Sequence, residues 1–288
     1  MKTTRIVPIA CALIALATSL QAQPSAHYVP GAEGIKAASL PPPGFYLRDY
    51  NYFYWSDRLN DASGNKSGPP NFETHTYANL PRAIWITDTK FLGGYVGVDA
   101  LIPLVDEHVR AGGYDNSTFG IGDLFGEGTL SWHVKQFDFS LASGVWTPTG
   151  NSGGTRAGAG FWTFMQTAGA TWYVDEAKTW AVSALNRFEF NTEQRDSHIT
   201  YGDAYTLEWG VSKSVCQEAD LGIVGYYQQQ VTGNSTKSPL NRVAAVGPEV
   251  NVLIPKIVLF VSCRYNYEFM AESRAQGQAV TLTLTKPF

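Results

Sequence analysis

Charged side chains recur at alternate positions within segments that are otherwise rich in apolar residues. Ser131 and His133 share the polar face of one such segment, and a nearby acid would complete the residue types of a hydrolase. These residue types often meet on a polar face by chance, and the chain has no Gly-x-Ser-x-Gly turn to present a nucleophile. Charged groups can instead line a polar path through a membrane. The candidates for the lining of such a path are Asp99, Glu127, Arg187, Glu189, Glu208, Glu249, Arg264 and Glu268.

Two interpretations of these eight residues stay open. They can form an ion-paired network that simply fills the interior of a barrel, or a track whose acids and bases select solutes by size and charge. The interpretations overlap, because Arg187 and Glu189 share a face of one segment, as do Arg264 and Glu268. The excess of acids would disfavour anionic solutes.

The sequence predicts no metal site and no cofactor. Its histidines are scattered without the spacing of metal ligands. The glycine pairs Gly120-x-Gly122 and Gly93-Gly94 lie in strand or loop context with no helix after them, so they are not nucleotide-binding loops.

Alternation of apolar and polar residues predicts strands as the elements that position the charges. In Asp203–Lys213, for example, Tyr205 and Trp209 lie on the face opposite Glu208. Successive strand side chains point to opposite faces, so one face is apolar and the other polar. About twelve such strands are expected near 45–56, 72–87, 91–103, 123–134, 137–147, 161–174, 179–191, 203–216, 220–231, 242–254, 257–270 and 278–288.

The connections between these strands alternate in length. Long ones are expected at 57–71, 104–122, 148–160, 192–202, 232–241 and 271–277, and short turns near 88–90, 135–136, 175–178, 217–219 and 255–256. Outer-membrane barrels have this arrangement, with an even number of antiparallel strands, short periplasmic turns and long outer loops. The sequence therefore predicts an all-β fold, a transmembrane antiparallel barrel over residues 45–288.

A soluble β-sandwich also alternates, and two features favour the barrel over it. Aromatic residues stand near the ends of the apolar faces, such as Trp162 and Trp172 in one strand and Trp180 and Phe190 in the next, as in the girdles at membrane interfaces. The chain also ends in an alternating strand with a terminal Phe288. A terminal phenylalanine resembles the signal read by the barrel assembly machinery, so that machinery and membrane lipids are the expected partners.

Composition and charge argue against two further classes of protein. Of the 288 residues 44% are hydrophobic and only 16% charged, and the mean hydropathy of −0.14 excludes a bundle of transmembrane helices. The formal charge of −4 makes a nucleic-acid partner improbable.

The N-terminus has the pattern of an export signal. Lys2 and Arg5 precede an apolar run at 6–20, with a predicted cleavage site after Ala22, so residues 1–22 are expected to be a signal peptide. Export then leaves Cys216 and Cys263 on non-adjacent strands, where packed free thiols are expected rather than a disulfide.

Two features of the mature N-terminus leave alternatives open. The segment 23–44, rich in Pro and Gly, is either a disordered periplasmic tail or a partial plug that folds back into the barrel through Ile35 and Leu40. In the first strand, Asp49 and Asn51 slightly favour placing their own face inward and the tyrosines outward. The reverse orientation would put a tyrosine ladder in the lumen, suited to stacking aromatic solutes.

Three stretches together resemble the outer-membrane family named for the meta-pathway of phenol degradation. They are the block from His27 to Lys36 with its continuation Pro41–Tyr54, the stretch Gly122-Asp123-Leu124 followed by Trp146–Gly150, and Gly247-Pro248-Glu249 followed by Tyr267-Glu268-Phe269 and the terminal Lys286-Pro287-Phe288. The resemblance implies an outer-membrane barrel of a Gram-negative bacterium that is associated with the breakdown of aromatic compounds and helps hydrophobic substrates cross.

The function expected from residues and resemblance together is passive uptake of small aromatic or hydrophobic molecules, without a catalytic step. The alternative is a closed barrel that does not transport and acts as a structural or binding protein through its outer loops. Inward bulk at Leu185, Tyr226, Gln228, Gln230 and Arg264 would favour that alternative. An enzyme of the outer membrane is the third and least favoured hypothesis.

Overall fold

The fold is an antiparallel β-barrel, described by a computed structural model over residues 26–151 and 157–288. The predicted signal peptide, residues 1–22, lies outside the described residues. The strands are β1 (Gly44–Ser56), β2 (Glu73–Phe91), β3 (Gly94–Leu101), β4 (Leu104–Ala111), β5 (Tyr114–Ile121), β6 (Phe125–Val134), β7 (Phe137–Trp146), β8 (Thr163–Tyr173), β9 (Trp180–Asn191), β10 (Ala204–Cys216), β11 (Ala219–Gln230), β12 (Arg242–Ile254), β13 (Leu259–Glu272) and β14 (Gln278–Pro287). No helix long and apolar enough to cross a membrane occurs in the described part of the chain.

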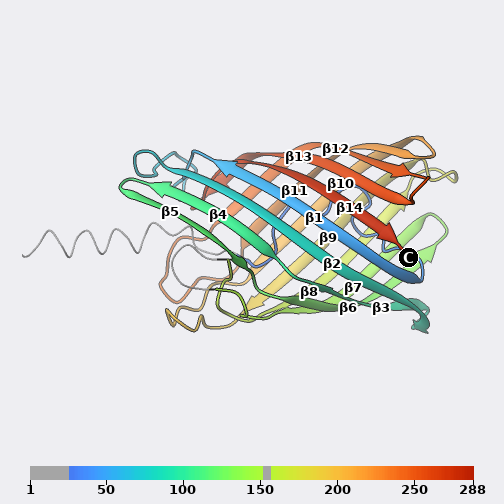
Figure 1. The fold of residues 1–288 in the computed structure, drawn as a ribbon, viewed down its shortest axis with the longest axis horizontal. Coiled ribbons are helices and arrows are strands. Elements are labelled where there is room, and N and C mark those ends of the chain that lie inside the picture. The colour runs from blue at the N-terminus through green and yellow to red at the C-terminus, as the bar shows by residue number, and fades with distance from the viewer. Residues whose placement is uncertain (1–25, 152–156) are drawn as a thin grey trace, which may run out of the picture.

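Twelve of these strands close into a ring (Figure 1). β1 pairs with β2 on one side and with β14 on the other, which leaves β4 and β5 as a pair outside the ring. The prediction of an all-β, twelve-stranded antiparallel barrel is confirmed. The short connections at 92–93, 135–136, 174–179, 217–218 and 255–258 lie at the end where β1 begins and β14 ends, and the longer ones lie at the opposite end. We call these the short-turn end and the long-loop end.

The segment 104–122, predicted to be a long outer loop, is instead mostly the hairpin of β4 and β5. β2 is long enough to pair with β3 through Arg82–Phe91 and with β4 through Glu73–Asn79, so the hairpin prolongs the wall past the ring (Figure 1). On this side of β2, regular pairing is interrupted between Asn79 and Arg82, near Pro81 and Pro103, which have no N–H to donate to a neighbouring strand. Gly112 closes the hairpin with a φ of 63°, in the left-handed region that favours glycine.

The outer surface of the barrel is apolar and carries aromatic residues near both ends. Phe137, Trp172 and Trp180 are exposed near the short-turn end, and Trp162 and Phe269 near the long-loop end. This pattern is the one expected of a wall that faces lipid. Most side chains on the other face of the twelve ring strands are buried in the interior.

Cys216 and Cys263 are both free, but both are exposed. The expectation that these thiols are packed was wrong. Cys263 pairs with Val250 of β12 and Leu282 of β14, so it belongs to the outward face of β13.

For the first strand, the orientation that the sequence slightly favoured is wrong, and the alternative left open, with the tyrosines inward, is the one observed. Tyr46, Tyr50 and Tyr52 are buried inside the barrel, whereas Asp49 and Asn51 face outward. Hydrogen bonds with neighbouring side chains, which the sequence pattern does not reveal, lower the free-energy cost of placing these two polar side chains on the outer face. Asn51 donates to Asp49 at 3.0 Å, Asn79 of β2 donates to Asp49 at 2.7 Å, and Tyr77 donates to Asn51 at 2.8 Å. Hydrogen-bonded polar groups cost much less to hold in an apolar surround than unpaired ones do.

Candidate functional site: a lumen occupied by the N-terminal segment

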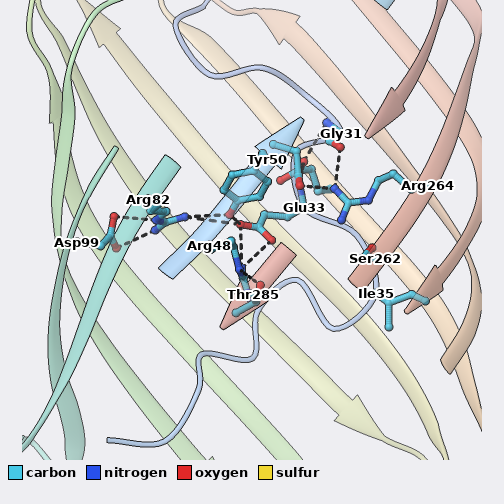
Figure 2. Close-up of polar contacts among 12 residues, drawn as sticks. Gly31, Glu33, Ile35, Arg48, Tyr50, Arg82, Asp99, Ser262, Arg264 and Thr285 are labelled. Atoms are coloured by element: carbon cyan, nitrogen blue, oxygen red, sulfur yellow. Dashed lines mark hydrogen bonds and ion pairs between the residues drawn. The ribbon is translucent and has the colours of Figure 1, made fainter. Parts of the chain in front are cut away.

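Residues 26–43, which we call the N-terminal segment, lie inside the barrel. His27 contacts Asp123 and Thr163 towards the long-loop end, and Ser39 lies 3.3 Å from the hydroxyl of Tyr173, towards the short-turn end. Figure 2 shows the middle of the segment, at Gly31, Glu33 and Ile35, surrounded by strands of the wall. The segment therefore runs along the lumen before the chain joins the barrel at β1.

Three wall carboxylates bind the backbone of the segment. Glu189 of β9 accepts hydrogen bonds from the backbone N–H groups of His27 and Tyr28, both at 2.9 Å. Glu208 of β10 accepts from those of Gly31 at 2.9 Å and Glu33 at 3.0 Å. Hydrogen bonds to an ionised acceptor are roughly twice as strong as those between neutral groups. The wall thus supplies the partners that an irregular buried backbone needs.

The carboxylate of Glu249, on β12, continues this pattern and is itself held by the wall. It accepts from the backbone N–H of Ile35 at 2.8 Å and from the guanidinium of Arg264 at 3.2 Å. Arg264 also donates to the carbonyl oxygens of Gly31, at 3.0 Å, and Ala32. The carboxylate on β12 therefore accepts from a backbone N–H of the segment, and the guanidinium on the adjacent strand β13 donates to its carbonyl oxygens.

Side chains of the segment contact the barrel as well. Lys36 forms an ion pair with Asp220 at 2.8 Å, and His27 Nε2 lies 2.8 Å from Oδ2 of Asp123, in the connection before β6. The His27 ring also stacks on Trp146, with ring centroids 5.6 Å apart.

Glu33 lies at the centre of the charge network (Figure 2). It pairs with Arg48 at 3.3 Å, lies 3.6 Å from Arg82 and accepts the Tyr50 hydroxyl at 2.5 Å. Burial opposes the charged form of Glu33, but the guanidinium groups of Arg48 and Arg82 outweigh burial and hold the pKa of Glu33 below its ordinary value. Glu33 is therefore ionised at neutral pH despite being buried.

All eight residues singled out as lumen-lining candidates have their side chains inside the barrel. Asp99 and Glu127 pair with Arg82, while Glu268 accepts from the hydroxyls of Tyr54 and Tyr226. The ion pairs run across strands rather than along them: Arg187 lies 2.6 Å from Glu208, and Arg264 binds Glu249. The eight are Asp99, Glu127, Arg187, Glu189, Glu208, Glu249, Arg264 and Glu268.

Sequence reasoning missed three further members of this network, Glu33, Arg48 and Arg82. Arg48 shares the tyrosine face of β1, so the incorrect orientation of that strand also placed Arg48 outside. Arg82 is in the segment 72–87 that was predicted as a strand, and it stands two residues from the apolar Leu80 and Ile84, which are inward as well. An arginine within an apolar run was the available signal, because a charge at that position needs a buried partner.

The two residues predicted to contact the barrel from a plug lie within the segment. Ile35 is half-buried, and its side chain packs against Gly222, where a methyl group would lie 3.0 Å from Ile35 Cδ1. Leu40 is half-buried near the short-turn end. The bulky inward residues Leu185, Tyr226, Gln228, Gln230 and Arg264 are all buried, so they reduce the free lumen further.

A cavity of about 650 Å³ lies in the lumen at the long-loop end. The apolar part of its wall includes Leu80, Leu101, Val105, Phe125 and Trp146. Its floor is polar and consists of Glu33, Arg82, Glu127 and Arg187 together with the segment residues His27 and Tyr28. An apolar cavity of this size with a few convergent polar groups is typical of sites for small ligands.

The residues considered for a hydrolase do not form a catalytic arrangement. His133 Nδ1 lies 2.9 Å from Asp138, but the Ser131 hydroxyl has no hydrogen-bond partner in the described residues. A nucleophile must lie within hydrogen-bond reach of its base. Within residues 26–151 and 157–288, no group of three or more His, Cys, Asp or Glu residues is arranged to hold a metal ion.

Comparison with known proteins gives one family and a set of barrels. The family model described as "Putative MetA-pathway of phenol degradation" matches residues 56–284. The chain matches none of the curated proteins with which it was compared.

Among solved structures, an outer membrane channel from Pseudomonas putida F1 superposes with a TM-score of 0.77 at 14% identity, over 91% of this chain and 100% of that one. The translocator domain of the autotransporter NalP from Neisseria meningitidis gives a TM-score of 0.53 at 10% identity, over 97% of each chain. The beta domain of a Bordetella autotransporter gives 0.51 at 11% identity, over 86% of this chain and 100% of that one. These similarities show that the fold is that of outer-membrane barrels.

Proposed function

The chain belongs to the family described as a putative MetA-pathway of phenol degradation, and on that premise we propose that it lets small aromatic or hydrophobic molecules cross the outer membrane passively. The cavity at the long-loop end carries this proposal. Its walls combine aromatic rings with aliphatic side chains, and its volume of about 650 Å³ leaves room for a single-ring molecule. The Pseudomonas putida relative in fold is itself a channel, which agrees with the proposal.

In the proposed mechanism the cavity binds the solute first, and the N-terminal segment controls its further passage. Tyr50, Tyr52 and Trp146 present aromatic surfaces to the solute. In the charged floor below them, Glu33 of the segment lies 3.6 Å from Arg82, and the segment occupies the lumen beyond it, so passage requires the segment to shift. No covalent step and no cofactor is needed for such passive movement.

A second candidate, a closed barrel that does not transport, is favoured by one observation. The N-terminal segment and inward side chains such as Tyr226 and Leu185 occupy the lumen below the cavity. If the segment never moves, the protein is a structural or binding protein of the membrane surface.

Uptake into proteoliposomes separates these functions. Labelled resorcinol and erythritol, which have the same number of non-hydrogen atoms, are compared in vesicles with the full chain, with a variant lacking residues 24–40, and without protein. Faster uptake of resorcinol than of erythritol, after subtraction of leakage through empty vesicles, supports an aromatic channel. Equal acceleration of both contradicts aromatic selectivity. Acceleration of neither, in both forms of the protein, supports the closed barrel.

Removal of residues 24–40 gives a second readout, the ionic conductance. Because the segment occupies the lumen, its removal is expected to raise the conductance in planar bilayers. An unchanged conductance would show that the segment does not restrict the pore.

A further inference from the structure

Buried hydroxyl groups without hydrogen-bond partners gather on one inner wall of the barrel. Seven side-chain hydroxyls in the described residues are buried and unpartnered, and five of them belong to β6, β8 and β9. All five side chains are at most 8% exposed. They are Thr129, Ser131, Thr167, Thr171 and Ser183.

These hydroxyls follow directly below the cavity. Glu127 and Met165 line the cavity, and Thr129 and Thr167 are the next inward residues of the same two strands towards the short-turn end. Thr171 then pairs with Ser183 across β8 and β9. The five hydroxyls therefore form a column, which we call the hydroxyl wall, that leads from the cavity floor towards the short-turn end of the barrel.

The N-terminal segment is attached to the rest of the barrel more firmly than to the hydroxyl wall. Between Tyr28 and Ala38, its hydrogen bonds and ion pairs with the barrel run to β1, β2 and β9–β14, with β9 contacted through Tyr28. Next to them, Ser39 lies 3.3 Å from the Tyr173 hydroxyl of β8, near the short-turn end. Against the hydroxyl wall it makes a van der Waals contact instead, where Ala38 packs on Gly169 so closely that a methyl group at residue 169 would lie 2.7 Å from Ala38 Cβ. A shift of the segment would therefore open this side first.

We propose that solute passes the N-terminal segment along the hydroxyl wall, between residues 34–40 and strands β6–β9. This inference rests on the proposed function and adds the route and its chemical selectivity. A buried hydroxyl without a partner gains free energy when a passing molecule offers it a hydrogen bond. The route therefore favours small neutral molecules with at least one hydroxyl or carbonyl group over hydrocarbons of the same size.

Thiol reactivity in the full chain tests the route. In a background with Cys216→Ser and Cys263→Ser, cysteine is placed by Thr167→Cys or Ser183→Cys on the hydroxyl wall. Thr281→Cys on β14 is the matched control, because Thr281 is also fully buried but contacts the segment through the carbonyl of Gly31. A small cationic methanethiosulfonate is added to the reconstituted protein, and modification is followed by mass spectrometry.

Since a buried thiol reacts only when its surroundings open, thiols at 167 and 183 are expected to react at least about tenfold faster than the thiol at 281. Equal rates, or a faster reaction at residue 281, would overturn the route.

Removal of the hydroxyls tests the selectivity. Thr167→Val with Thr171→Val keeps the shape of both side chains, and resorcinol uptake is expected to fall about 30-fold, as for the loss of two hydrogen bonds of ordinary net strength. Thr283→Val, which removes an unpartnered hydroxyl from the opposite wall, should leave uptake near the wild-type rate. Equal effects of the two changes would refute the selectivity. If no form of the protein, including the 24–40 deletion, accelerates any solute, the proposed function itself fails.

Discussion

Glu208 is the wall residue with the most hydrogen bonds to the N-terminal segment, and its replacement by glutamine is expected to open the lumen. Oε1 accepts the backbone N–H groups of Gly31 and Glu33, and Oε2 accepts the Tyr28 hydroxyl at 2.7 Å and Arg187 at 2.6 Å. A glutamine has one carbonyl oxygen, so it retains at most one of these pairs of bonds. Its NH₂ group then faces the donors of the other pair.

The magnitude follows from the bonds lost. A hydrogen bond to a charged group contributes about 1.5–3 kcal/mol, so the loss of one or two bonds to the segment costs the closed state about 3 kcal/mol. A change of about 3 kcal/mol raises the ratio of open to closed channels about 100-fold. The measurement is the open probability of single channels of Glu208→Gln in planar bilayers, with heat-modified mobility on gels as the check that the barrel is folded.

Glu268→Gln is the matched control. Glu268 is equally buried, but it accepts hydrogen bonds from Tyr54, Tyr226 and the backbone of Gly277, which belong to the barrel and one of its loops. This variant should lower the stability of the barrel and leave the open probability unchanged. If Glu208→Gln and Glu268→Gln alter the open probability equally, or if a folded Glu208→Gln behaves as wild type, the wall carboxylates do not hold the segment in place.

Two further changes act on the same closed state. Gly169→Ala would place a methyl group 2.7 Å from Ala38 Cβ and 2.6 Å from Leu185 Cδ1, so it should push the segment from the wall and raise the conductance. Adding Ala38→Gly should lower it again, and a double variant that conducts as much as Gly169→Ala would contradict this contact. In the folded protein the pKa of Glu33 lies below its ordinary value, so ionised Glu33 stabilises the closed state at pH values above that ordinary pKa. This stabilisation is lost as the pH falls through the lowered pKa. Open probability should therefore rise in acid, with a flatter pH profile in Glu33→Gln; identical profiles would exclude Glu33 as the cause.

The inward position of the charged residues was predictable from the sequence because it depends on local alternation. Glu208 alternates with Leu207 and Trp209, so one apolar face determines where its carboxylate points. Alternation does not determine the inward face of the first strand, since that strand carries aromatic and polar residues on both faces. Its orientation is decided by partners on other elements: Asn79 and Tyr77 for its polar face, and Glu33 for Tyr50.

Two further features differ in how far the sequence could predict them. The hairpin within 104–122 had a signal, because Gly112-Gly113 between alternating residues is a typical two-residue turn. The course of the N-terminal segment had little, because its main bonds come from backbone N–H groups, which every residue but proline has. Only the wall carboxylates that bind those groups, Glu189, Glu208 and Glu249, could be read from the sequence.

The position of the N-terminal segment constrains the order of events during biogenesis. β1 and β14, the first and last strands, form the seam that closes the ring, with ten residue pairs from Tyr46–Pro287 to Trp55–Gln278. The segment lies inside this ring and is attached to strands β9–β13, which are synthesised long after it. A finished barrel would have to admit the segment through a lumen that is already narrowed by side chains. The segment is therefore best placed before the seam closes, as an internal template on which the carboxylate-bearing strands assemble.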